Sequence, residues 1–291
     1  MRLSPSRLLS ALGALIAAGA LAGALSGCGA SSATLDPVAQ AAEVTSATGG
    51  VQMRLNMSLS IPGLGSPVTA TGHGFFNYKA HEGELAIDMS GLPSSATEAL
   101  GGGPVHVDEL MKSTTIYVGS PLFAGRLPGG ARWMKVDLKK LGGVAGIDVQ
   151  SLMSGESNPA QFLEYLRAHG GSVHTVGSTM LHGVHTTRYQ GSIDLHQIAQ
   201  SLPESERGAA QAQLEKLASQ IGLSSIPFEV WVDDQHRVRR IEMNISINAA
   251  AQQGGMRMTI DFSGYGATPK VTVPADSEVF SAPTSSLSSD G

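Results

Sequence analysis

Cys28 is the only cysteine in this 291-residue chain, so it has no partner for a disulfide within the chain. It ends the stretch 25–28, which follows two arginines near the start and a long apolar run over residues 8–25. A basic start, an apolar middle and small residues before a cleavage point are the layout of a bacterial lipoprotein signal peptide. The pattern predicts that residues 1–27 are removed and that the thiol of Cys28 accepts a diacylglyceryl group.

Acylation of Cys28 would anchor the chain, because each buried CH2 group of an acyl chain contributes ~0.8 kcal/mol to membrane binding. The alternative is a transmembrane helix, since the apolar run is near the ~17–25 residues that span a bilayer. The run is rich in Gly and Ala and ends at the cysteine, which favours the lipoprotein interpretation. We expect an extracytoplasmic protein that is lipid-anchored to the cell membrane, with residues 28–35 as a lipidated, flexible tether.

The charge balance of the mature part is acidic. Removal of residues 1–27 takes away Arg2 and Arg7 and no acidic residue, which leaves 17 basic against 24 acidic residues, a net charge of −7. A protein that binds nucleic acid normally carries a basic footprint. We therefore expect no nucleic-acid partner.

The sequence shows no arrangement that is typical of an enzyme. The G-x-S-x-G elbow, the H-E-x-x-H motif and the phosphate-binding G-x-x-x-x-G-K loop are all missing from it. His174, His182 and His185 lie close in sequence, but the odd spacing of the last two places them on opposite faces of a strand. We expect no catalysis, no cofactor and no metal site, and we interpret the adjacent acids of residues 233–234 as a hairpin tip.

Two groups of basic side chains, three arginines after this predicted hairpin and three lysines near residues 135–140, have two interpretations. They could contact anionic lipid headgroups, or they could be solvated charges at sheet edges that discourage aggregation. The residues concerned are Arg237, Arg239, Arg240, Lys135, Lys139 and Lys140.

Strict alternation of apolar and polar residues is the clearest structural signal in the chain. It runs over residues 51–61, returns over 241–248 and 256–263 with a predicted hairpin loop at 249–255, and appears again over 228–232. A period of two gives a strand one apolar and one wet face, which is typical of antiparallel sheets. Weaker strand signals occur at residues 74–78, 84–89, 106–110, 114–118, 132–138, 172–176 and 186–193.

Helical signals are few. The Asp-Pro pair at 36–37 predicts a short helix that ends near residue 48, and further helices are expected from residue 158 to 170, at 193–201 and at 203–220. The fold class expected is therefore α+β, with a large curved antiparallel half-barrel sheet of about ten strands and a few helices packed on its concave apolar face. One domain is expected over residues 36–280, followed by a disordered tail over 281–291.

A broad apolar face on such a sheet suggests a binding site. The predicted helices have narrow apolar stripes, and incomplete cover would leave an apolar cavity; the alternative is a dry, filled core. Methionine is flexible and adapts to irregular shapes, which suits a site for alkyl chains. The candidate pocket residues are Met53, Leu55, Met57, Leu59, Phe228, Val230, Met243, Ile245, Met256 and Met258 on strands, with Leu214 and Leu217 on a helix.

Four blocks of sequence occur in a recognisable order: residues 132–138, 177–189, 228–241, and 261–266 followed by Val273-Pro274. Together with the cysteine motif they resemble the actinobacterial lipoprotein family that includes LppX, LprA, LprF and LprG. The resemblance implies a LolA-like fold, in which a half-barrel of antiparallel strands wraps around helices.

The resemblance also implies a function. It implies an apolar pocket for the acyl chains of large lipids, and carriage of lipids or lipoglycans within the cell envelope. The partners expected are thus a lipid or lipoglycan, the membrane through the anchor, and a membrane transporter. The alternative is an envelope sensor or interaction module on the same fold, without lipid transport.

Overall fold

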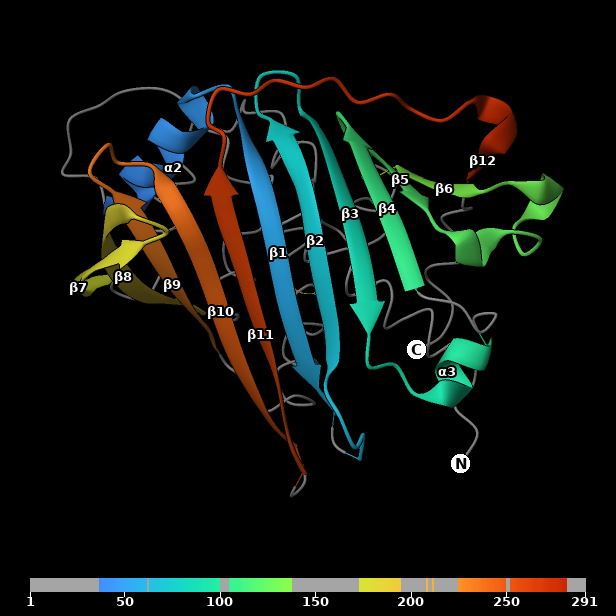
Figure 1. Ribbon diagram of the computed structural model, residues 1–291, viewed down its shortest axis with the longest axis horizontal. Coiled ribbons are helices and arrows are strands. Elements are labelled where there is room, and N and C mark those ends of the chain that lie inside the picture. Colours follow the sequence, from blue (N-terminus) through green and yellow to red (C-terminus); the bar gives the residue numbers. More distant parts are fainter. Residues whose placement is uncertain are drawn as a thin grey trace.

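Twelve strands form one open sheet in the order β12-β6-β5-β4-β3-β2-β1-β11-β10-β9-β8-β7 (Figure 1). The computed structural model describes residues 37–61, 63–99, 105–137, 173–194, 208, 211, 225–249 and 252–281. The strands are β1 (Gly50–Ser60), β2 (Val68–Asn77), β3 (Glu82–Ser90), β4 (Val105–Lys112), β5 (Thr115–Gly119), β6 (Trp133–Asp137), β7 (His174–Leu181), β8 (Val184–Asp194), β9 (Ser225–Asp233), β10 (Val238–Ala249), β11 (Gln252–Ser263) and β12 (Val279–Ser281).

Helices are minor components of the described part of the chain. They are α2 (Pro37–Ala47) and α3 (Ser94–Ala99), with single 3-10 turns η2 (Pro121–Phe123), η3 (Pro128–Gly130) and η4 (Asp276–Glu278). Neither α-helix, nor any other helix within these residues, has the length and apolar character needed to cross a bilayer.

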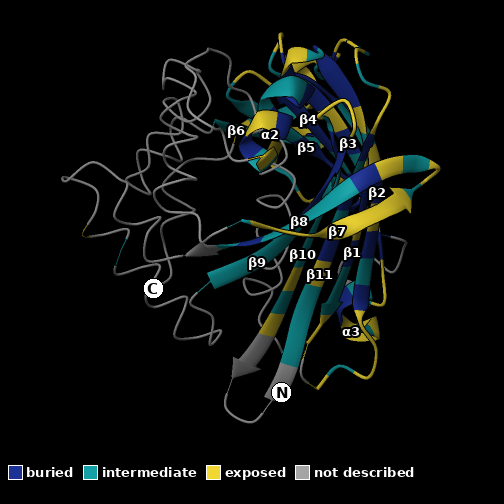
Figure 2. Ribbon diagram, turned by 90° about the vertical axis from the view of Figure 1, so that its left-hand side faces the viewer, coloured by how far each residue is buried: buried dark blue, intermediate teal, exposed yellow. Residues whose placement is uncertain are grey.

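The N-terminal strand β1 lies at the centre of the sheet. It pairs antiparallel with β2 on one side and with β11, from the far end of the chain, on the other. In side view β8 and β9 cross the central strands obliquely, so the sheet twists strongly from one edge to the other (Figure 2). Such a twist follows from the right-handed twist that each strand prefers.

The core lies on one face of this sheet. Inward positions alternate with exposed or half-buried polar ones along each central strand, as in the burial pattern of β3. The buried cluster includes Val51, Leu55, Ile87, Val107, Val118 and Ile260, which come from β1, β3, β4, β5 and β11. The period of two in the sequence therefore becomes a single apolar face that runs across neighbouring strands.

Helix α2 packs against β1, β9 and β10 at one end of the sheet (Figure 1). Ala39, Ala41 and Ala42 are buried in this contact. A hydrogen-bonded threonine fixes the helix, because Thr45 Oγ1 donates to the Ala41 carbonyl at 2.7 Å and accepts from the Val238 N–H at 2.8 Å. Thr45 is fully buried, so its hydroxyl satisfies a backbone donor that water cannot reach.

Several expectations are confirmed and some are wrong. The short first helix and all eleven predicted strand signals are present as α2 and β1 to β11. The sheet is mixed rather than antiparallel throughout, because β12 runs parallel to β6. The expected loop at 249–255 is also wrong: β10 reaches Ala249 and β11 begins at Gln252. Gly254 and Gly255 pair with β10, since the backbone ladder needs no side chain.

Other differences concern short elements. Ile193 and Asp194 belong to β8 and not to the start of a helix, because they pair with β9. The structure adds α3 and β12, which are too short to leave a periodic signal in the sequence. The helices expected from residue 158 and at 203–220, the signal peptide and the tether lie outside the described residues, apart from positions 208 and 211.

Candidate functional site

The ten candidate pocket residues on strands lie side by side on the apolar face. In one row across the sheet, Met57 of β1 is opposite Met258 of β11, which is opposite Met243 of β10, which is opposite Phe228 of β9. Directly opposed residues in antiparallel strands project from the same face and contact one another. Methionines from three strands therefore form a continuous apolar surface.

Three further rows complete this surface. One contains Leu55 and Val230, a second contains Leu59, Met256 and Ile245, and Met53 lies in a third. We call the resulting set the apolar block; it consists of Met53, Leu55, Met57, Leu59, Phe228, Val230, Met243, Ile245, Met256 and Met258. Leu214 and Leu217, the two candidates from a predicted helix, lie outside the described residues.

Burial differs within the apolar block. Leu55, Met57, Val230 and Met258 are buried. The other six side chains are only partly buried, and most of them pack against the core cluster. The block thus has a closed centre and a partly open margin.

Three further residues belong to the same face and were not among the candidates. Ile260 and Ile241 stand opposite each other in the row of Leu55, and Phe262 is opposite Met53. Their alternation with polar residues was visible in the sequence, so the same periodic signal would have found them.

One acidic side chain interrupts the apolar face. Glu109 is an inward residue of β4, opposite Leu85 of β3 and Val118 of β5, and its exposed fraction is only 6%. Among the described residues its Oε2 atom has no hydrogen-bond partner. Burial alone raises the pKa of the Glu109 carboxyl from its usual 4.5 to about 7.

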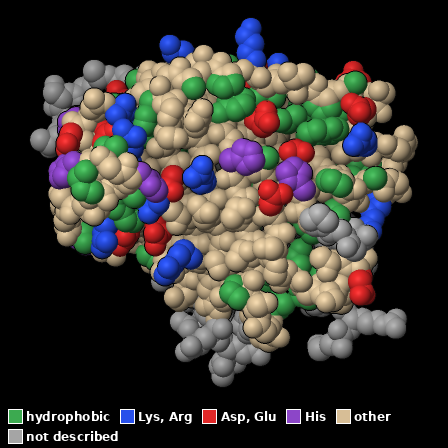
Figure 3. Space-filling view, in the orientation of Figure 1, with side chains coloured by type: hydrophobic (Ala, Val, Ile, Leu, Met, Phe, Trp, Pro, Cys, Tyr) green, Lys and Arg blue, Asp and Glu red, His purple; other side chains and the backbone are tan. Residues whose placement is uncertain are grey.

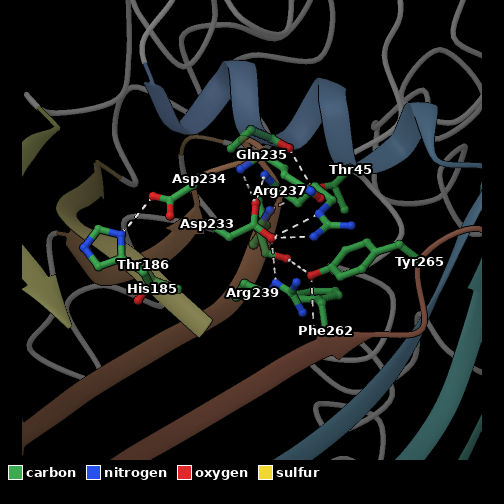
Figure 4. Close-up of polar contacts among 12 residues, drawn as sticks. Thr45, His185, Thr186, Asp233, Asp234, Gln235, Arg237, Arg239, Phe262 and Tyr265 are labelled. Atoms are coloured by element: carbon green, nitrogen blue, oxygen red, sulfur yellow. Dashed lines mark hydrogen bonds and ion pairs between the residues drawn. The ribbon is translucent and has the colours of Figure 1, made fainter. Parts of the chain in front are cut away.

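A charged cluster closes the turn between β9 and β10; it consists of Asp233, Arg237, Arg239 and Tyr265 (Figure 4). Oδ2 of Asp233 accepts from Arg239 Nε at 2.7 Å and from Arg237 Nη2 at 2.9 Å, while Oδ1 accepts from two backbone N–H groups of the turn. Both guanidinium groups lie over the Tyr265 ring, at 4.5 and 4.9 Å from its centroid. The hairpin tip predicted at residues 233–234 is therefore confirmed.

The carboxylate charge of Asp233 is neutralised within the charged cluster, which stabilises the turn between β9 and β10. Burial alone would raise the pKa of Asp233, but hydrogen bonds from the Arg237 backbone and the two guanidinium groups outweigh it and lower the pKa. The Tyr265 hydroxyl donates to the Val238 carbonyl at 2.6 Å, and burial raises its pKa to about 12. Arg237 and Arg239 thus neutralise a buried carboxylate, which is a use that neither sequence interpretation of these arginines included.

Arg240 has a similar internal partner. Its guanidinium forms a two-point ion pair with Asp261, at 2.6 and 2.9 Å, and lies 5.8 Å from the Trp231 ring. His182 Nε2 is 3.3 Å from Arg240 Nη2, and His185 pairs separately with Asp234 at 2.8 Å. Within the part of the chain that the structure describes, no group of three or more histidine and acidic side chains could hold a metal ion.

The opposite face of the sheet is polar. Figure 3 shows basic, acidic and histidine side chains interspersed across it. A groove of about 670 Å³ lies on this side, where the β7–β8 hairpin approaches the central strands. Its lining includes Arg54, His73, Glu84 and Asp261 from the sheet and His182 from the hairpin. This groove is distinct from the apolar cavity that the sequence predicted.

Comparisons with known proteins place these features in context. No family model and no curated protein sequence matches the chain. Among solved structures, the chain is similar to the lipoprotein LppX of Mycobacterium tuberculosis, at 14% identity and a TM-score of 0.42 over 81% of this chain and 96% of LppX. It is also similar to LprF of Mycobacterium bovis, at 15% identity and a TM-score of 0.39 over 84% of this chain and all of LprF.

A LolA superfamily protein from Nitrosomonas europaea is a more distant match, at 9% identity and a TM-score of 0.25 over 78% of this chain and 90% of that protein. LppX and LprF belong to the group that the sequence blocks resemble.

The charged cluster predicts a large local effect of one carboxylate. Asp233→Ala should lower the free energy of unfolding by about 3 kcal/mol at pH 7, because it leaves two guanidinium groups without their buried partner. The pKa of Asp233 is lowered, so its stabilisation is present above the ordinary carboxyl pKa and is lost as the pH falls below about 4. Urea unfolding measures both effects. The control is Asp234→Ala, whose carboxylate is exposed and should change stability by less than about 1 kcal/mol; equal losses in the two variants would contradict the prediction.

Glu109 predicts the opposite pH dependence. The pKa of Glu109 is raised on folding, so the folded state holds the proton more tightly. The contribution of Glu109 to stability is therefore most favourable below about pH 4.5 and is lost as the pH rises through about 7. The free energy of unfolding of the wild type minus that of Glu109→Gln should fall by roughly 3 kcal/mol between about pH 4.5 and pH 8. Urea unfolding across this range checks the sign, and a difference that does not change with pH would show that the carboxyl is not desolvated.

Proposed function

We propose that this chain is a membrane-anchored lipoprotein that binds the acyl chains of a lipid or lipoglycan against the apolar face of its sheet. It carries that ligand within the cell envelope and performs no covalent chemistry on it. Residues 1–27 are the signal peptide, Cys28 is the lipidated residue, residues 28–35 are the tether, residues 36–280 form one domain, and residues 281–291 form a tail.

One observation carries the proposal: the ten strand candidates converge on a single apolar surface across four adjacent strands. A contiguous apolar surface that is not fully buried is a candidate place for an apolar ligand, and six of these ten side chains are only partly buried. Methionine supplies five of the ten side chains, and its flexible thioether accommodates alkyl chains of varied shape. The partly buried margin of the apolar block is where we expect acyl chains to enter.

The proposal includes the helices expected from residue 158 and at 203–220. They would pack over the concave apolar face, with Leu214 and Leu217 lining the pocket opposite the block. The lipid headgroup would stay in water at the edge of the sheet. A membrane transporter would supply or receive the ligand, and the location is the outer side of the cell membrane.

The polar face favours a second candidate function, an envelope sensor or interaction module. The groove of about 670 Å³ near the β7–β8 hairpin is lined by charged side chains of both signs, which suits polar contacts with a protein partner. A pull-down from the native host distinguishes the two: a signalling protein that is retained by the wild type and lost in Arg54→Glu supports this alternative.

Native mass spectrometry of the protein purified from its own host tests lipid binding. We expect copurified lipid, and a loss of about tenfold or more in lipid occupancy for Met243→Asp, because an unpaired charge in an apolar site is strongly unfavourable. Asn244→Asp is the matched control, since it adds the same charge one residue away on the opposite, exposed face. Absence of lipid from the wild type, or equal occupancy in the two variants, would reject the carrier function.

The anchor has its own test. Growth with labelled palmitate should label the wild type and the control Ser31→Ala, whereas Cys28→Ala should carry no label, since its side chain has no thiol to acylate. The mass of the N-terminal peptide should show cleavage before Cys28. Labelled Cys28→Ala protein would show that the anchor lies elsewhere.

A further inference from the structure

Glu109 is the exception on an otherwise apolar surface. The residues around it on the same face are Leu85 of β3, Val118 of β5, and Val107 and Met111 of its own strand, and none of them is titratable. The charged groups nearest in sequence, His106 and Asp108, lie on the opposite face, where they bind each other and Asp88. The carboxyl group therefore has an apolar environment among the described residues.

The position of Glu109 connects it to the apolar block. Reading across the sheet in one row, Met53 of β1 is opposite Gly74 of β2, which is opposite Leu85 of β3, which is opposite Glu109 of β4. Three strand spacings separate Met53 from Glu109, which is about 14 Å. Because Gly74 has no side chain, Leu85 is the one side chain between them in this row.

A buried carboxyl group whose Oε2 atom has no partner among the described residues is unfavourable for folding. A buried polar atom without a hydrogen-bond partner retains its full desolvation penalty, whereas an apolar residue of similar size would have none. Departures of this kind from the local pattern are typical of functional sites. A bound molecule that offers a hydrogen bond would satisfy the carboxyl group.

We propose that Glu109 is a polar anchor in the apolar face and that its carboxyl group binds a hydroxyl group of the lipid whose chains occupy the apolar block. This inference rests on the proposed function and adds the chemical class of the ligand: an amphiphile with a hydroxyl group within reach of its acyl chains.

The choice of a hydroxyl follows from the protonation of the carboxyl group. With a pKa of about 7, Glu109 exists in both forms near neutral pH. A hydroxyl donates to the ionised form and accepts from the protonated form, so it satisfies both. An ester carbonyl accepts only from the protonated form, and an ammonium group binds the ionised form more strongly, so its affinity rises with pH. The pH dependence of binding therefore distinguishes a hydroxyl, an ester carbonyl and an ammonium group as the partner of Glu109.

Native mass spectrometry of the full chain released from detergent tests whether Glu109 binds a hydroxyl group. It measures the affinities for two probes, 1-monooleoylglycerol and methyl oleate. Both carry the same acyl chain and an ester, and only the first has hydroxyl groups. Glu109→Leu should reduce the affinity for monooleoylglycerol relative to methyl oleate by about tenfold, which corresponds to one hydrogen bond to the carboxyl group. Glu109→Gln keeps a donor and an acceptor and should preserve the preference.

The control and the pH series complete the design. Glu98→Leu removes an exposed carboxylate on α3 and should leave the ratio of the two affinities unchanged. In the wild type the affinity for monooleoylglycerol should vary by less than about twofold between about pH 6 and pH 8, because a hydroxyl satisfies both forms of the carboxyl. Leucine replaces glutamate among apolar neighbours, so Glu109→Leu should fold, and urea unfolding verifies it.

Three results would overturn the inference. If both probes bind and Glu109→Leu leaves their ratio unchanged, Glu109 is not the anchor, while lipid binding stands. If monooleoylglycerol binding weakens above pH 7 in the wild type but not in Glu109→Gln, the carboxyl binds the ester carbonyl and not a hydroxyl. If neither probe binds any variant, both the anchor and the proposed function are wrong.

Discussion

The structure depends on one constraint, which is that an open sheet with a single apolar face must remove that face from water. Burial of apolar area is the main favourable term in folding. Each central strand contributes its inward side chains to the same surface, from Val118 on β5 through Leu55 on β1 to Val230 on β9. The core and the candidate binding site are therefore parts of one surface. Any group that covers the apolar block, from the protein or from a ligand, removes its partly buried side chains from water and so stabilises the fold.

The charged cluster stabilises the chain reversal between β9 and β10 at one end of the sheet. A buried carboxylate is tolerated at the β9–β10 turn because five N–H groups, three of them from two guanidinium groups, donate to Asp233. Thr45 joins the same turn to α2 through the Val238 N–H, and Tyr265 joins it to the end of β11. Three segments from distant parts of the chain thus meet at one polar hub, and the apolar face begins immediately beside it. Glu109 is the contrast: it has the same functional group and a similarly small exposed fraction, but among the described residues no donor reaches its Oε2 atom.

Much of this architecture could be predicted from local pattern. The alternation over residues 51–61 determines which side chains of β1 share a face, and this holds in any sheet into which the strand is built. Short elements such as β12 could not be predicted, because three residues carry no periodic signal. The Gly-rich segment before Met256 suggested a loop, yet it continues β11 since β10 offers a complete ladder of partners. Here long-range hydrogen bonding overrides local propensity.

The sequence by itself determined the lipoprotein-like motif that ends at Cys28, the two-faced character of the strands and the ten members of the apolar block, because each depends only on residue type and spacing along the chain. Tertiary structure alone decided which strands are neighbours, that Met57, Met258, Met243 and Phe228 meet in one row, and that Arg237 and Arg239 serve Asp233. It also decided that Glu109 is isolated among apolar side chains. The physical reason is that contacts between residues far apart in sequence set the register and the choice of partner strand. A periodic pattern along one strand contains no information about those contacts.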